Sequence, residues 1–511
     1  MIVEVSQKQN YIFASRKLKD NVARSQQIRL VTESTFFRET AVELYNEAEN
    51  LVYSGGGHAV LQFSDESAAT AFAKAISGRV LRLYPEIELY LRQIPYEPEL
   101  SPKENLKKLS SELEKKKSLR KASFRWLSLG VEELNTERWR PEPEQLSDTV
   151  SKMTEQIAPP EGMIYPLEFD QMIKQLGSHG RGQRDESFLA VVHIDGNAMG
   201  RRVESLLENV TNWEQAGDLL RCFSRSVDED YNAAFRETVE RLLNCRPELR
   251  EHKVLPIRPV IMAGDDVCFV TAGKIGLECA RFFLEALTSR INVGDGKDYA
   301  ACAGVALVHH KYPFHMAYHL SEELCSSAKC FSHSLDADGS VSAMDWHIEF
   351  GGLKNGLREI REDYTTEDGN RLELRPVAVV VPSGDLPMTV DPTRTYSYYR
   401  GLCGALQADC GRIARGKLKN LRTALKQGET ETRFYLADKQ ISDLLYHPFN
   451  AKYQSVDSYR EALKQMFDMR VTEAKDVFAD VDGDGIKRSL FFDALEMLDH
   501  FEPLEEVTTL A

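Results

Sequence analysis

In the middle of the chain, short apolar runs of strand length alternate with stretches whose apolar residues recur at helical spacing. In chain order, the segments are a strand at 188–195, a helix from about 213 to 243, strands at 256–262 and 267–272, a helix at 275–291 and a strand at 301–308. The two neighbouring strands are close enough along the chain to form a tight hairpin. This β-α-β-β-α-β order predicts a ferredoxin-like unit, in which an antiparallel sheet carries a helical layer on one face.

The first hundred residues repeat this order in a reduced form. The repeat consists of a strand at 2–5, a basic helix near 16–33, a hairpin at 51–63, an alanine-rich helix and a strand at 87–91. When the hairpins of the two halves are aligned, Gly57 and His58 stand in the place of the pair Asp265–Asp266. The chain therefore contains two related units, and the N-terminal unit lacks the acidic residues of the second.

The chain is long enough for three or four domains at roughly 150 residues each, and the pattern predicts an α+β protein. A helix beginning at Pro313 and a strand near 342–350 complete the second unit, and helices are expected at 418–425 and 459–469. The expected parts are a ferredoxin-like domain at 1–95, a charged helical connector at 96–186, a second ferredoxin-like domain at 187–355 and a mainly helical domain at 356–511.

The composition is ordinary for a cytoplasmic globular protein, with 42% hydrophobic and 28% charged residues. No apolar stretch approaches the roughly 20 residues that span a bilayer, and the N-terminus does not have the pattern of a secretion signal. The net charge of −15 argues against nonspecific binding of nucleic acid by the whole surface. The nine cysteines form no C-x-x-C pair, so neither a zinc ribbon nor a disulfide framework is indicated.

Two acidic turns carry the most informative chemistry in the chain. Asp195 ends the strand at 188–195, and Asp265 and Asp266 lie in the hairpin of the same predicted sheet. Three carboxylates brought together repel one another, and a divalent cation removes that repulsion. We therefore expect Asp195, Asp265 and Asp266, with the carbonyl of Gly196, to hold two Mg²⁺ or Mn²⁺ ions. The alternative is that these short turns are purely structural.

Glycine-rich turns near these aspartates predict phosphate contacts. The turn from residue 196 to residue 200 joins a strand to a helix, where backbone N–H groups can donate to phosphate oxygens. Lys329 is a candidate cation for the same phosphates, although it could equally be a solvated lysine at a helix end. The expected nucleotide-binding residues are Gly196, Asn197, Ala198, Met199, Gly200, Gly264 and Lys329, with Gly55, Gly56 and Gly57 for a second nucleotide.

These motifs resemble the large palm-containing subunit of type III CRISPR effector complexes and its standalone relatives, the CRISPR polymerase-cyclases. The resemblance rests on Ile194 to Gly200, Ala263 to Asp266, Ala303 to Ala306, Tyr312–Pro313, Ala328–Lys329, Tyr11 to Ser15 and Ser54 to Gly57. It implies two palm domains that face each other, with Asp195, Asp265 and Asp266 as catalytic residues. It also implies ATP as substrate, a cyclic oligoadenylate or cyclic dinucleotide as second messenger in antiviral defence, and partners among defence-complex subunits or effectors.

The chain departs from this family pattern in several places. The family's Gly-Gly-Asp-Asp begins here with Ala263, whose methyl group could narrow the approach of a ligand to the backbone. Asn197 stands where many relatives carry another acid, so we do not count it as a metal ligand. The first palm starts at residue 1, without an upstream HD-type nuclease domain or a zinc-binding cysteine set. We therefore expect a cyclase without the nuclease.

Two other functions stay open at this point. The palms could belong to a noncatalytic nucleotide sensor or scaffold subunit of a CRISPR-like complex, or the enzyme could make a cyclic dinucleotide from GTP. Nucleobase choice depends on pocket contacts that the sequence does not locate. The ring size and linkage of the product, the activating signal and self-association of the chain stay open too.

Overall fold

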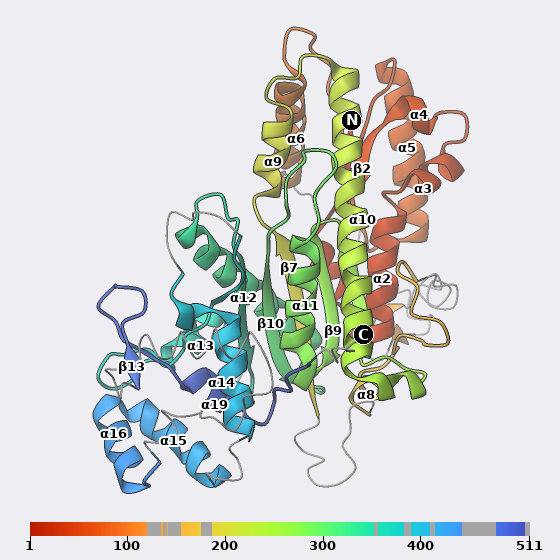
Figure 1. The fold of residues 1–511 in the computed structure, drawn as a ribbon. Helices are drawn as coiled ribbons and strands as arrows, with labels where there is room; N and C mark the ends of the chain where they lie inside the picture. Colours follow the sequence, from red (N-terminus) through yellow and green to blue (C-terminus); the bar gives the residue numbers. More distant parts are fainter. Residues whose placement is uncertain are drawn as a thin grey trace, which may run out of the picture.

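The computed structural model describes residues 1–119, 134–135, 140–141, 155–174, 187–351, 356–382, 390–408, 414–441 and 477–505. These residues form an α+β protein with two main sheets, each covered by helices (Figure 1), so the predicted fold class is confirmed. The expected helix at 459–469 lies outside the described residues, as does nearly half of the expected connector. Within the described part of the chain, no helix is both long and apolar enough to cross a membrane.

The larger sheet contains the predicted acidic strand and hairpin. Its strands are β7 (Phe188–Gly196), β8 (Ile257–Ala263), β9 (Asp266–Ala272), β10 (Ala301–His309), β11 (Ser342–Ile348) and β12 (Val377–Val380). They lie in the order β12-β11-β10-β7-β9-β8. From β10 to β8, each strand runs antiparallel to its neighbour. This is the strand order of a ferredoxin-like unit, to which β11 adds in parallel next to β10.

The smaller sheet belongs to the N-terminal unit. It consists of β1 (Ile2–Ser6), β2 (Leu51–Gly55), β3 (His58–Leu61) and β4 (Glu88–Arg92), in the order β2-β3-β1-β4. Counted along each unit, this is the same order as in the larger sheet, so the internal repeat extends to topology. The helices of this unit are α1 (Lys8–Ile12), α2 (Leu18–Leu30), α3 (Ser34–Thr40), α4 (Glu47–Asn50) and α5 (Glu66–Leu83).

One long helix, α10 (Trp213–Cys245), connects the two units. It begins at Asn212, whose side chain accepts the backbone N–H groups of the first turn, and it extends for about 50 Å at 1.5 Å per residue. Its first half contacts the N-terminal hairpin, where Ser224 Oγ donates to the carbonyl of Ser54 over 3.2 Å. Its second half packs against α11 (Gly276–Thr288) of the larger unit (Figure 1).

Helix α12 (Phe314–Leu335) packs along β7, β10 and β11. It approaches β10 at Gly304, where an added Cβ would lie 2.0 Å from the carbonyl oxygen of Ser321 and 2.3 Å from the backbone nitrogen of Cys325. No other residue fits there without displacing the helix. This close approach sets the distance between the acidic strand β7 and the side chains of α12.

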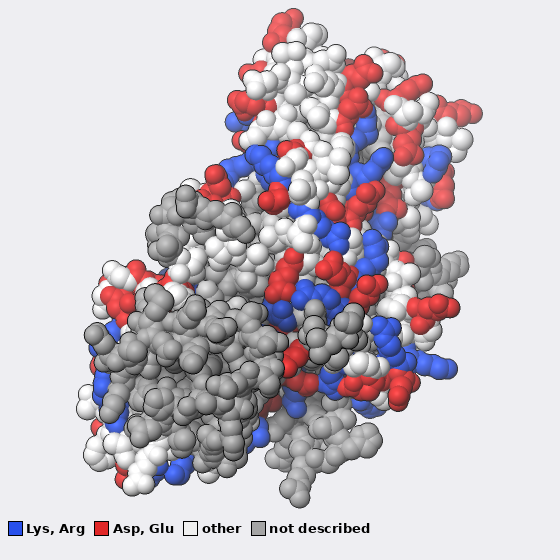
Figure 2. Space-filling model, viewed as in Figure 1, with Lys and Arg blue, Asp and Glu red and all other residues white. Residues whose placement is uncertain are grey.

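The remaining helices lie around these two units. They are α6 (Pro102–Ser118), α8 (Phe169–Lys174), α9 (Met199–Leu206), α13 (Leu357–Glu362), α14 (Tyr396–Ala408), α15 (Arg415–Gln427), α16 (Glu429–Asp438) and α19 (Phe492–Glu496). The fully buried Glu278 of α11 joins the C-terminal helices to the larger unit, because it accepts hydrogen bonds from Tyr396 Oη over 2.7 Å and Arg400 Nε over 3.1 Å. Positive and negative residues are interspersed on the face of the molecule that Figure 2 shows.

Candidate active site between the two sheets

Strand register brings two of the three predicted aspartates together. Asp195 at the end of β7 lies directly opposite Asp266, the first residue of β9. Asp265 belongs to a two-residue hairpin loop with Gly264, whose φ of +69° is a conformation that glycine adopts readily. The N–H of Gly196 donates to the carbonyl of Asp265 over 3.3 Å, which fixes the loop against the end of β7.

Gly196 is required at this edge for steric reasons. A Cβ added there would lie 2.6 Å from Tyr231 Oη, 2.8 Å from Met199 Cγ and 3.0 Å from Asp265 Cβ. All three contacts are shorter than the separations that van der Waals radii allow. The Asp-Gly pair is therefore explained by packing against α9, α10 and the hairpin.

The edge carries uncompensated negative charge. Burial, followed by repulsion from Asp195, raises the pKa of Asp265 to about 6 and that of Asp266 to about 7. Lys329 of α12 lowers both pKa values, since its ammonium group lies 2.6 Å from Asp195 Oδ2 and 3.0 Å from the carbonyl of Gly196. Lys8 also lowers the pKa of Asp266, and two lysines do not neutralise three carboxylates, so a further cation is favoured at this edge.

The residues present fit a divalent cation. Lys329 already places a positive charge on Asp195 and Gly196, two of the predicted metal ligands, and Asp266 Oδ1 has no hydrogen-bond partner. Within the described ranges, no three His, Cys, Asp or Glu side chains converge on a ready-made metal site. Mg²⁺ is commonly held by one or two carboxylates plus substrate phosphates and water, and it needs no complete protein cage.

The turn after β7 was expected to contact phosphate, but only part of it is free of other hydrogen bonds among the described residues. The side chain of Asn197 is buried and donates to the carbonyl of Gly339 over 2.8 Å and more weakly to two further acceptors, so it anchors the turn to the loop after α12. The N–H of Asn197 is also used, since it donates to the carbonyl of Ala300 over 2.8 Å. Ala198 has a left-handed φ of +56° and begins α9. The N–H groups left for a ligand are those of the first turn of α9, at Met199 and Gly200.

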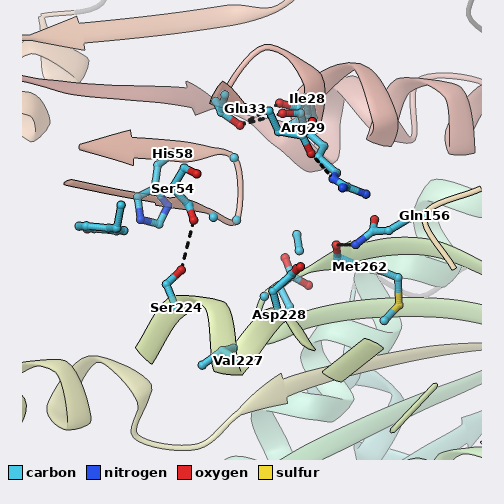
Figure 3. A pocket seen from close by; sticks show the side chains of 18 of the residues that line it. Ile28, Arg29, Glu33, Ser54, His58, Gln156, Ser224, Val227, Asp228 and Met262 are labelled. Atoms are coloured by element: carbon cyan, nitrogen blue, oxygen red, sulfur yellow. Dashed lines mark hydrogen bonds and ion pairs between the residues drawn. The ribbon is translucent and has the colours of Figure 1, made fainter. Parts of the chain in front are cut away.

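A large cavity of about 1220 Å³ separates the acidic hairpin from the N-terminal unit (Figure 3). Of the predicted residues, eight line it: Met199, Gly200, Gly264, Asp265, Asp266, Gly55, Gly56 and Gly57. The remaining five do not line it: Asp195, Gly196, Asn197, Ala198 and Lys329. Asp195 and Lys329 still act on the cavity through the strand pairing with Asp266 and through their charge.

The opposite wall is the glycine hairpin of the N-terminal unit. Gly56 and Gly57 have φ values of +58° and +77° and form its two-residue loop, and a Cβ on Gly56 would lie 3.6 Å from the carbonyl of Ala263. The tips of the two hairpins therefore lie close together, and both hairpins line the cavity. Lys8, which follows β1, donates its ammonium group to the carbonyl of Gly56. Burial lowers the pKa of Lys8, while the charges of Glu4, Asp266 and Asp265 raise it.

Sequence reasoning missed several residues of this cavity. Lys8 could have been found from the internal repeat, because it follows the end of β1 as Asn197 follows the end of β7. Arg29 of α2 and Asp228 of α10 face each other across the cavity (Figure 3), and no local pattern relates them.

Comparison with known proteins supports the interpretation of the larger unit. Residues 188–334 match the family model described as Cas10/Cmr2, second palm domain. A search of curated proteins gave no match. Solved structures of similar fold include a Csm1-Csm4 cassette in complex with pppApApA, with 15% sequence identity, 92% of this chain and 69% of that chain covered and a TM-score of 0.47.

An apo Csm1-Csm4 cassette is also similar, with 17% identity, 65% of this chain covered and a TM-score of 0.41. A Csm1-Csm4 subcomplex of the type III-A CRISPR-Csm interference complex matches with 15% identity over 65% of this chain, with a TM-score of 0.42. The chain spans only 52% and 53% of the length of these two solved chains. The segment from residue 188 to residue 334 therefore resembles the second palm domain of the Cas10/Cmr2 family.

Proposed function

We propose that this chain joins nucleoside triphosphates, ATP foremost, into a cyclic oligoadenylate or cyclic dinucleotide in the cavity between its two units. One observation carries the proposal: the acidic hairpin at 264–266 and the glycine hairpin at 55–57 face each other across one cavity. Its volume of about 1220 Å³ exceeds the roughly 300–1,000 Å³ typical of a pocket for one small ligand. Two nucleotides can therefore lie side by side, each against its own hairpin.

The reaction transfers a nucleotidyl group. A ribose hydroxyl oxygen of one nucleotide forms a bond to the α-phosphorus of the other, and the bond from that phosphorus to the β-phosphate bridging oxygen breaks. Pyrophosphate leaves, and the hydroxyl proton passes to solvent. Repetition of the step lengthens the chain, and the same step within one chain closes the ring. Such transfer requires mainly positioning and charge neutralisation from the protein.

The residues divide this work between the two walls. Asp265 and Asp266, with Asp195, would hold Mg²⁺ or Mn²⁺, and two such ions stabilise the attacking and leaving oxygens when bound. The first-turn N–H groups of α9 and the charge of Lys329 would orient the donor triphosphate. Lys8 and the glycine hairpin would hold the acceptor nucleotide, where the absence of side chains allows phosphate to approach the backbone.

The proposal is tested by incubating the protein with Mg²⁺ and one nucleoside triphosphate at a time. The products are then separated and identified by mass. Cyclic or linear adenylate from ATP is the expected product, and its absence with and without cellular activators would contradict the proposal. The double variant Asp265→Asn, Asp266→Asn should lose turnover, because the carboxylates would supply the charge that binds the metal. Asp338→Asn is the matched control, since that carboxylate is almost fully exposed.

A nucleotide sensor or scaffold subunit of a defence complex is the second candidate. It is favoured by the contact of Lys329 with Asp195 and Gly196, which occupies two predicted metal ligands in the ligand-free chain. Calorimetry with ATP, followed by analysis of the recovered nucleotide, separates the two functions. Tight binding with intact ATP after hours would favour the sensor, whereas released pyrophosphate would favour the enzyme.

A further inference from the structure

The two carboxylate oxygens of Asp266 have different surroundings. The side chain is 38% exposed and lines the cavity, yet Oδ1 is enclosed by protein and has no hydrogen-bond partner among the described residues. A buried carboxylate oxygen without a donor costs free energy, more than a neutral group does. The space behind Oδ1 is therefore where a donor is required.

Two buried polar atoms without a hydrogen-bond partner belong to side chains near Asp266. They are Nδ1 of His193, on β7, and Oη of Tyr318, on α12. His193 Nδ1 is 3.7 Å from Asp266 Oδ1, and the rings of His193 and Tyr318 meet edge to face at 5.5 Å between centroids. The hydroxyl of Tyr318 is protonated at neutral pH, as a phenol ordinarily is, so it can donate. The two donors and the acceptor are thus matched in number and kind.

The carboxylate of Glu322 is a second acceptor beside the Tyr318 hydroxyl, and it has other donors as well. Glu322, the other carboxylate near Tyr318, already accepts from Gln9 Nε2 at Oε1 and from His319 Nδ1 at Oε2, each over 3.1 Å. The Tyr318 ring is also fixed in direction, because Phe13, the residue after α1, packs on it at 4.0 Å between centroids. An approach of less than 1 Å would bring His193 Nδ1 to hydrogen-bonding distance from Asp266.

We propose that His193 and Tyr318 are positioning residues that donate hydrogen bonds to Asp266 Oδ1 and thereby direct Oδ2 into the cavity toward a divalent cation. The inference rests on the proposed function for the identity of the site. Groups that hold metal ligands from behind fix their orientation, and their loss typically costs about 10- to 100-fold in metal affinity. His193 would donate through Nδ1, which requires the Nδ1–H tautomer.

Manganese binding to the nucleotide-free protein tests the inference without recourse to activity. Mn²⁺ is titrated into wild type and into Tyr318→Phe, and free Mn²⁺ is followed by electron paramagnetic resonance. We expect Tyr318→Phe to weaken binding by about 10-fold or more. Tyr399→Phe is the matched control, because its hydroxyl is likewise buried and unpartnered within the described residues but lies on α14 in the C-terminal region. Thermal unfolding of both variants measures the general cost of losing a buried hydroxyl.

A pair of substitutions at His193 separates donation from packing. His193→Asn keeps an N–H donor near the position of Nδ1, whereas His193→Leu removes it, so the asparagine variant should retain more of the Mn²⁺ affinity. Equal Mn²⁺ affinity in wild type, Tyr318→Phe and His193→Leu would overturn the inference, as would a wild-type protein that binds no Mn²⁺. If wild type binds Mn²⁺ and forms no nucleotide product, the proposed function fails while the affinity comparison still decides the positioning role.

Discussion

Substitution of Gly196 by alanine should disable the site while leaving every charged group in place. The added methyl group would lie 2.6 Å from Tyr231 Oη, which is 0.8 Å closer than the 3.4 Å at which ordinary Cβ contacts begin. Tyr231 is buried on α10 and Asp265 is held in the hairpin loop, so neither can withdraw freely. Overpacking of this kind costs about 1–3 kcal/mol of folding free energy.

The effect on catalysis should be larger than the effect on stability. A displacement near 1 Å in a positioned site can cost about 100-fold in rate, and here the displaced group is Asp265 or the end of β7. We therefore expect Gly196→Ala to lower kcat about 100-fold, measured as pyrophosphate released from ATP at saturating Mg²⁺. Urea unfolding of the same sample should show the loss of 1–3 kcal/mol.

The matched control is Gly78→Ala on α5, where an added Cβ meets no atom within 4 Å. There the substitution should stabilise the protein by up to about 1 kcal/mol through helix propensity and leave product formation unchanged. Wild-type activity and stability in Gly196→Ala would refute the steric explanation of the Asp-Gly turn.

Three further predictions follow from the same contacts. Lys329→Met should lower kcat about 100-fold and raise the pKa of Asp265 and Asp266 further, since Lys329 lowers both; carboxyl NMR titration checks the shift. Because those pKa values are raised in the folded state, to about 6 and about 7, the two carboxyl groups should contribute stability to the metal-free protein that is present below about pH 4 and is lost as the pH rises to 7; the difference in thermal unfolding between wild type and the Asp265→Asn, Asp266→Asn variant, followed against pH, measures this contribution. Arg202→Met should cost about 3–5 kcal/mol in urea unfolding, because it leaves the buried carboxylate of Asp295 unpaired; an unchanged midpoint would contradict this.

The scaffold of the site was predictable because apolar periodicity records which faces are buried. The run at 188–195 became β7, one residue longer, and the hairpin residues Gly264 and Asp265 became the two-residue loop. The repeat in the N-terminal half was predictable for the same reason. Glycine pairs mark hairpin loops whether or not acidic residues accompany them.

Local sequence pattern did not predict which of the candidate residues contact other protein groups instead of a ligand. Its place in a glycine-containing turn predicted that Asn197 contacts phosphate. Its side chain instead donates to the carbonyl of Gly339, which is 142 residues away along the chain. Lys329 contacts Asp195 only because Gly304 lets α12 approach the sheet closely. These contacts depend on how helices and strands pack against one another. The apolar periodicity within one segment carries no information about that packing.

The uninterrupted length of α10 has a mechanical consequence. The helix contacts the glycine hairpin near Ser224 and supports the acidic edge through Tyr231, with no proline or glycine between these residues to act as a bending point. The distance between the two hairpins is therefore fixed by a rigid helix that has no hinge between the two contacts. We expect the span available to a growing oligonucleotide to be nearly constant through turnover, so that product length is limited by the geometry of one helix.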